Sequence, residues 1–197
     1  MKTRSLICDS ANDVALMRAW LPVDIVETSH FFVPSRLSDT PSTAASILKS
    51  YPLQALLICN AYTTNRQLIL RLEGRAEERL TLSAPPQRFE IELVSPSLPG
   101  MFFQSSILFK RTFGKEASDR LHLMGRYDPE RAIGEAGMTL PEIIERLDDT
   151  SRAQLRATPI AQSVLDRIAR LESKSTRHEN SGDRAMHSRP PPSLHWE

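Results

Sequence analysis

Two polar clusters in the sequence combine residue types that could do chemistry. Asp9 and Asp13 follow the first apolar run of the chain, so two carboxylates stand four residues apart. Asn60 and Tyr62 follow a second apolar run, Ala55–Cys59, and offer an amide and a phenol. In open α/β sheets, ligands bind beyond the carboxyl ends of such strands. We therefore expect a site at this edge, with Asp9 and Asp13 as the candidate metal ligands.

Both clusters also have simpler structural explanations. Asp9 and Asp13 can serve as a cap and a first-turn acid, which the helix dipole favours, and we prefer this interpretation to a residual metal site. Asn60 and Tyr62 can be ordinary polar residues at a strand end, although an asparagine there could still donate to a phosphate. The second cluster contains no carboxylate, and this absence argues against a complete metal centre.

Other chemistry-bearing residues give weaker signals. Cys8 and Cys59 each end an apolar run, which indicates buried thiols in a reducing compartment, with a metal or redox pair as the alternative. The five histidines are scattered and give no zinc spacing. The chain contains no glycine-rich phosphate loop, serine nucleophile elbow or dinucleotide-binding fingerprint.

One predicted helix carries a basic face formed by four arginines, namely Arg66, Arg71, Arg75 and Arg79. Such a face is usually only solvated. Contact with nucleic acid phosphates is the alternative that we keep open.

The elements that must position these residues alternate between strands and helices. Apolar runs predict strands at residues 5–8, 23–26, 55–59 and 89–94, the last of them alternating with acids and therefore half-exposed near a sheet edge. Helical periodicity predicts helices at about 14–21, 40–50 and 66–82. This order is typical of an α/β fold with a mainly parallel sheet, right-handed crossovers and helices on both faces.

The rest of the chain is expected to be helical and then disordered. After an α/β core at 4–94, residues 101–172 show helix-only periodicity, including a capping box at Thr139–Glu142. Residues 1–172 should form one domain with this helical extension packed on the sheet. Residues 173–197 contain few apolar side chains and are expected to be a disordered tail.

Composition narrows the class of protein. The 197 residues include 25 Lys plus Arg and 24 Asp plus Glu, so the net charge of +1 favours neither a nucleic-acid tail nor a membrane surface. No apolar stretch is long enough to span a membrane, and the apolar run after Met1 is too short for a signal peptide. We expect a cytoplasmic protein.

The order of these pieces resembles small bacterial Toprim-like proteins, which are related to the nuclease domains of overcoming-lysogenization-defect proteins. Their first strand ends in Glu-Gly-x-x-Asp, matched here by residues 9–13. Their next motif, Asp-x-Asp-Thr, is matched by residues 60–63, and Pro-Glu-x-Glu is matched by residues 96–99. The C-terminal helices also look similar, so the resemblance covers residues 4–172.

The resemblance implies a Toprim-like fold and metal-assisted phosphodiester chemistry, in which clustered carboxylates hold Mg²⁺. The motifs have lost most of their acids: Asn60 and Tyr62 replace the Asp-x-Asp pair, and Ser97 stands at a glutamate position. The chain is therefore expected to be a catalytically inactive binding or scaffold module that needs no cofactor. Its partner would be a protein, such as an active homologue or an ATPase, or a nucleic acid. The alternative is a weak Mg²⁺-dependent nuclease using Asp9 and Asp13.

Overall fold

The sheet at the centre of the protein has four parallel strands. The computed structural model describes residues 3–34 and 40–186, with side chains described as far as residue 174. The strands are β1 (Arg4–Cys8), β2 (Ser29–Phe32), β3 (Gln54–Asn60) and β4 (Phe89–Val94), in the order β2-β1-β3-β4. This α/β arrangement is Rossmann-like and confirms the expected parallel sheet, including the position of β4 at one edge.

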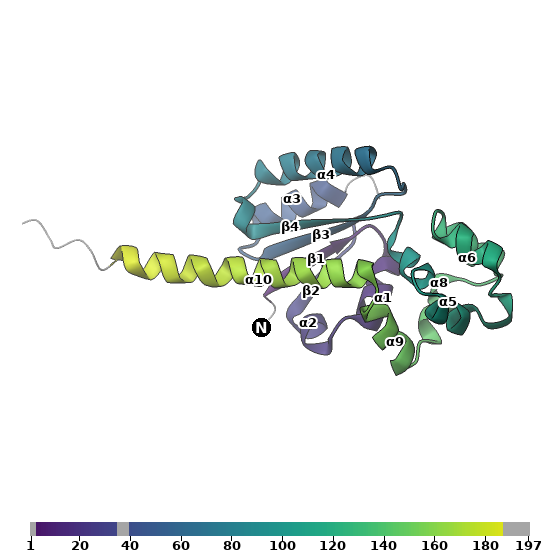
Figure 1. Ribbon diagram of the computed structural model, residues 1–197. Helices are drawn as coiled ribbons and strands as arrows, with labels where there is room; N and C mark the ends of the chain where they lie inside the picture. The colour runs from purple at the N-terminus through teal and green to yellow at the C-terminus, as the bar shows by residue number, and fades with distance from the viewer. Residues whose placement is uncertain (1–2, 35–39, 187–197) are drawn as a thin grey trace, which may run out of the picture.

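Helices cover both faces of the sheet (Figure 1). One face carries α3 (Thr40–Ser50) and α4 (Arg66–Thr81), and the other carries α1 (Ala11–Trp20) and α10 (Pro159–Met186). Successive strand residues alternate between two apolar clusters: Leu6 and Leu56 face the α1 side, whereas Ile7 and Leu57 face the α3 side. This two-sided burial explains why the central strands are continuous apolar runs.

The second strand lies later in the chain than the sequence pattern predicted. Residues 23–26 belong to a helix, α2 (Val23–Thr28), and the strand β2 follows directly after it. The β-branched residues suggested a strand, but Val23 is 71% exposed and cannot belong to a buried strand. Pro22 starts the helix, and the Ser29 hydroxyl donates to the Ile25 carbonyl oxygen at 2.6 Å where it ends.

The segment after β4 is helical, as expected. Its helices are η3 (Leu98–Phe103), α5 (Ser106–Phe113), η4 (Gly114–Glu116), α6 (Asp119–Gly125), α7 (Pro129–Glu135), α8 (Leu140–Glu145) and α9 (Asp149–Arg156), while a further short helix, η2 (Pro86–Arg88), precedes β4. The capping box of Thr139 and Glu142 is confirmed at the start of α8. These helices pack mainly on α1, η3 and one another beyond the strand ends, and α10 is the one that lies along the sheet. The expectation that the helical extension at 101–172 packs on the sheet is therefore correct for α10 and wrong for most of the helices before it.

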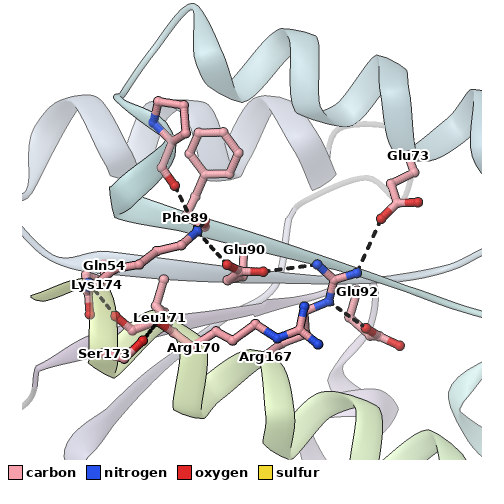
Figure 2. Close-up of polar contacts among 11 residues, drawn as sticks. Gln54, Glu73, Phe89, Glu90, Glu92, Arg167, Arg170, Leu171, Ser173 and Lys174 are labelled. Atoms are coloured by element: carbon pink, nitrogen blue, oxygen red, sulfur yellow. Dashed lines mark hydrogen bonds and ion pairs between the residues drawn. The ribbon is translucent and has the colours of Figure 1, made fainter.

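The helix α10 is attached to the edge strand by a network of charges (Figure 2). Arg167 donates to Glu90 at 3.0 Å and to Glu92 at 3.2 Å, and it also pairs with Glu73 of α4 at 3.4 Å. Lys174 pairs with Glu90 and donates to the Phe89 carbonyl oxygen. Glu90 and Glu92 are only 7% and 9% exposed, so the half-exposed strand predicted here is wrong: α10 covers its acidic face.

The described part of α10 also extends past the expected end of the domain. The helix continues to Met186, whereas the sequence predicts a disordered tail from residue 173. Polar composition suggested disorder, but it does not exclude a helix that continues from a packed segment. Residues 187–197 lie outside the described residues. Within the described residues, no helix is long and apolar enough to cross a membrane.

Candidate functional site

The two polar clusters predicted from the sequence meet at the carboxyl edge of the sheet. Strands β1 and β3 are parallel neighbours with Cys8 paired to Ile58, so the residues that follow them lie side by side. Ser10 caps α1 and accepts from the Asp13 backbone N–H at 3.1 Å. Asp9 therefore ends the strand, and Asp13 lies in the first turn of the helix.

Asn60 connects the ends of three strands. Its backbone N–H donates to Asp9 Oδ2 at 2.6 Å, and its side-chain Nδ2 donates to Asp13 Oδ2 at 3.1 Å. Its Oδ1 accepts from the backbone N–H of Leu98, in the segment that follows β4, at 2.7 Å. The amide thus uses a donor and an acceptor at once, which a carboxylate cannot do.

Both aspartates are buried, and both accept hydrogen bonds from neighbouring residues. Asp9 is 6% exposed and Asp13 is 4% exposed. Burial raises the pKa of Asp13 to about 6, although hydrogen bonds from Ser10 and Asn60 oppose the shift and the nearby Asp9 and Glu130 add to it. Burial likewise raises the pKa of Asp9 against the hydrogen bond from Asn60. These carboxylates resist ionisation more than ordinary surface aspartates.

This donor set does not fit the Mg²⁺ site that the Toprim resemblance implies. One oxygen of each aspartate already accepts a hydrogen bond from Asn60. Across residues 3–34 and 40–174, no group of three or more His, Cys, Asp or Glu side chains is arranged to hold a metal ion. Mg²⁺ requires near-octahedral oxygen coordination, which two aspartates engaged by Asn60 do not supply.

Asp9, Asp13 and Asn60, which are joined by hydrogen bonds, are called the hub below. Tyr62 occupies an unusual backbone conformation beside this hub. Its φ of 50° lies in the left-handed region, which a non-glycine residue adopts only at a cost of about 1 kcal/mol or more. The conformation is held by the Tyr62 N–H, which donates to the Pro96 carbonyl oxygen at 2.7 Å, and by the Ala61 N–H, which donates to Val94 at 2.8 Å. Tyr62 is 60% exposed, and its partial burial raises the pKa of the phenol.

Ser97, the third-motif candidate, does not join the hub. Its side chain is completely buried, and its hydroxyl has no hydrogen-bond partner among the described residues. Only its neighbour Leu98 contacts Asn60, and it does so through the backbone.

A cavity of about 300 Å³ opens beside the hub. Its lining combines hub residues with the start of α7 and the turn before α8, namely Ser10, Asn12, Asp13, Asn60, Tyr62, Pro99, Glu130, Ile133, Gly134, Met138, Thr139 and Leu140. The contribution of α7 and α8 to this cavity was not predicted from the sequence. The Asp128–Pro129 helix start was recognisable and places Glu130 in the first turn, but nothing local in the sequence relates this turn to Asp13.

The remaining candidates lie outside this arrangement. Cys8 and Cys59 are buried free thiols, as expected, and burial raises the pKa of both far above the usual range. The four arginines of α4 are exposed and do not line the cavity, namely Arg66, Arg71, Arg75 and Arg79. Within the described residues, none of the four forms an ion pair.

Comparison with known proteins gives no relative: no family model, curated protein or solved structure matches this chain.

Proposed function

We propose that this protein is a Toprim-like domain without catalytic activity that works as a binding or scaffold module. The observation that supports this proposal is the position of Asn60. It stands where an active relative would carry the first acid of Asp-x-Asp, and its amide forms hydrogen bonds to Asp13 and to the Leu98 backbone. The residues of the former site therefore hold strand ends together, and one oxygen of each aspartate is already used in this role.

Electrostatics supports the loss of phosphodiester chemistry. A metal-dependent nuclease needs several converging carboxylates so that bound cations offset the charge of the phosphate. Without the metal, carboxylates repel the same phosphate. Asp13 and Glu130 line the cavity, and among the described residues no lysine, arginine or histidine joins them there. A nucleic acid backbone would meet net negative charge at this edge.

A protein partner therefore fits the edge better than a nucleic acid does. The partner class would be a protein such as an active homologue or an ATPase. Nucleic acid contact would have to use the exposed arginines of α4, on the surface of a different helix.

The test is a cleavage assay combined with calorimetry. Purified protein is incubated with single- and double-stranded DNA and RNA in Mg²⁺ and in Mn²⁺, beside the double variant Asp9→Ala/Asp13→Ala. We expect no cleavage above that of the double variant and no saturable heat of Mg²⁺ binding at low millimolar concentration. Cleavage that the double variant abolishes would establish a weak nuclease in place of the binding module.

Reversion supplies the positive control. Asn60→Asp with Tyr62→Asp restores the missing pair of acids, and we leave Ser97 unchanged because a glutamate would be completely buried there. If the scaffold retains Toprim geometry, Mg²⁺ affinity rises in the reverted protein and falls again when Asp9→Ala is added. Circular dichroism at each step confirms that the variants are folded.

A further inference from the structure

The lining of the cavity beside Asn60 has two chemically different parts. The residues from the strand ends and the start of α1 are polar or aromatic and include Asp13 and Tyr62. The segment from α7 to α8 contributes the apolar residues Ile133, Met138 and Leu140, together with Glu130. A volume of about 300 Å³ lies at the small end of the range for ligand pockets, which suits one side-chain-sized group.

The charge of the cavity is negative and uncompensated. Asp13 and Glu130 line it, and neither forms an ion pair within the part of the chain that the structure describes. Each lies in the first turn of a helix, α1 and α7 respectively. A helix N-terminus offers roughly half a positive charge, so two helix ends leave part of the two carboxylate charges without a counter-ion.

Asp13 retains one oxygen for a ligand. The two hydrogen bonds that its side chain accepts, from Ser10 at 2.7 Å and from Asn60 at 3.1 Å, both reach Oδ2. The described residues form no hydrogen bond to its Oδ1, so this atom is available to a bound group. Glu130 is exposed and adds a second acceptor to the lining of the same cavity.

Tyr62 and Met138 extend this preference for a cation. A positive group over the face of a tyrosine ring is attracted by the ring quadrupole, and the Tyr62 ring is largely exposed beside the two acids. Methionine adapts to irregular apolar ligands because its side chain is flexible and polarizable. Together these residues provide acceptors and an aromatic face for a charged head, and aliphatic contacts for a stem.

We propose that this cavity binds an alkylammonium group, a positively charged nitrogen on an apolar chain, as carried by a lysine side chain of a partner protein or by a free amine. The proposal rests on the proposed binding function and names the chemistry that its edge recognises. Other ligands fit the lining less well. A phosphate would meet two carboxylates, and a purely apolar group would cover Asp13 and Glu130 without donating a hydrogen bond to either, which costs free energy.

The experiment compares four probes by NMR on the full-length isotope-labelled protein. The probes are N-acetyl-lysine methylamide, n-butylammonium, N-acetyl-norleucine methylamide and N-acetyl-(Nε-acetyl)lysine methylamide. We expect the first two to shift the amide resonances of Tyr62, Gly134 and Thr139 and the methyl resonances of Ile133 and Met138 in a saturable way. The two uncharged probes should bind at least about tenfold more weakly, since they lack the charge-assisted hydrogen bonds.

The two charged probes separate the possible sources of the ligand. Tighter binding of the peptide-like lysine probe assigns the site to a lysine of a protein partner. Equal binding of n-butylammonium assigns it to free amines. Both results support the alkylammonium site. Equal binding of the norleucine probe, or no saturable shift with any charged probe, would overturn it.

A pair of matched variants tests the role of charge in the cavity. Glu130→Gln removes an exposed carboxylate of the cavity and should weaken lysine-probe binding about threefold to tenfold. Glu145→Gln removes the same charge from an exposed position on α8 outside the cavity and should leave the affinity unchanged. Equal weakening by both variants would show a nonspecific charge effect and contradict the proposal.

The outcomes also separate this inference from the proposed function. Absence of both cleavage and amine binding removes the alkylammonium site and leaves a non-catalytic module with another ligand. Metal-dependent cleavage that requires Asp9 and Asp13 overturns the proposed function, whatever the amines do.

Discussion

At the residue scale, the amide of Asn60 provides what no other side chain of similar size could provide at its position. Aspartate would keep the acceptor for the Leu98 N–H but lose the donor to Asp13, and leucine would lose both. An amide also adds no charge to a place that already holds Asp9 and Asp13 at low exposure.

The variant Asn60→Asp tests this dependence. It would place a carboxylate oxygen about where Nδ2 now lies, 3.1 Å from Asp13 Oδ2, so one of the two acids must take up a proton or the pair must separate. We expect the free energy of unfolding to fall by about 2–4 kcal/mol at pH 7, measured by urea denaturation. Asn12→Asp, an exposed neighbour, is the control and should stay within about 0.5 kcal/mol of the native protein. Equal stability of the two variants would contradict the role of the Asn60 donor.

Asp13 should also make stability depend on pH. Its pKa is about 6 in the folded protein and about 4 in the unfolded chain, so the folded state binds the proton more tightly. The resulting stabilisation is complete below pH 4 and is lost as the pH rises through 6. Relative to Asp13→Asn, the native protein should lose about 2 kcal/mol of unfolding free energy between pH 4 and pH 7. Parallel pH profiles for the two proteins would show that Asp13 has an ordinary pKa.

At the element scale, β4 and α10 depend on each other. The strand carries two acids on the face that α10 covers, and Arg167 of the helix donates a hydrogen bond to each of them. Burial alone would raise the pKa of Glu90, yet Lys174 and Arg167 hold it below the usual value. Burial alone would lower the pKa of Arg167, yet Glu90 and Glu92 raise it above the usual value. The strand therefore needs the helix to remain in place.

Replacing Arg167 by methionine tests this pairing. The variant keeps the apolar stem but leaves Glu90 and Glu92 without their shared partner. Removal of one side of a buried pair typically costs about 3–5 kcal/mol, and we expect about 3 because Arg167 is partly exposed. Thermal and urea unfolding measure the loss. Adding Glu90→Gln and Glu92→Gln should restore part of it, and a triple variant as unstable as the single one would show that the stem, not the charge, matters.

Elements with strong local signals were predictable from the sequence. The periodic helix at 66–82 and the capping box at Thr139 follow from contacts within a few residues of each other. The helix at 23–28 was missed because β-branched residues favour strands and its exposure depends on neighbours elsewhere in the chain. The burial of Glu90 was missed for a similar reason: its partner Arg167 is 77 residues away, and no local pattern joins them.

At the scale of the whole molecule, the candidate site is assembled from distant segments. Parallel strands brought Asp9 and Asn60 together as the sequence predicted, because their carboxyl ends share one edge. The cavity wall on α7 and α8 could not be predicted, since its position depends on how the helices after β4 pack on α1 and η3. The order of the parallel strands therefore explains why the hub residues meet, whereas the packing of α7 and α8 determines the shape of the cavity.

The contribution of α10 to the whole fold can be measured by truncation. A chain ending at residue 174 keeps Arg167, Lys174 and the buried Ile168 and Leu171, and it loses only a segment with few apolar residues. Its melting temperature should stay within about 2 °C of the full chain, since about 1 kcal/mol shifts it by 2–4 °C.

A chain ending at residue 166 is the matched comparison. It removes two buried apolar side chains, each contributing about 2–3 kcal/mol, and exposes the strand acids without their partner. It should melt at least about 15 °C lower or lose its cooperative transition. If instead the chain ending at 174 loses more than about 5 °C, residues after 174 stabilise the body directly, and the boundary of the folded unit lies beyond the charge network of Arg167 and Lys174.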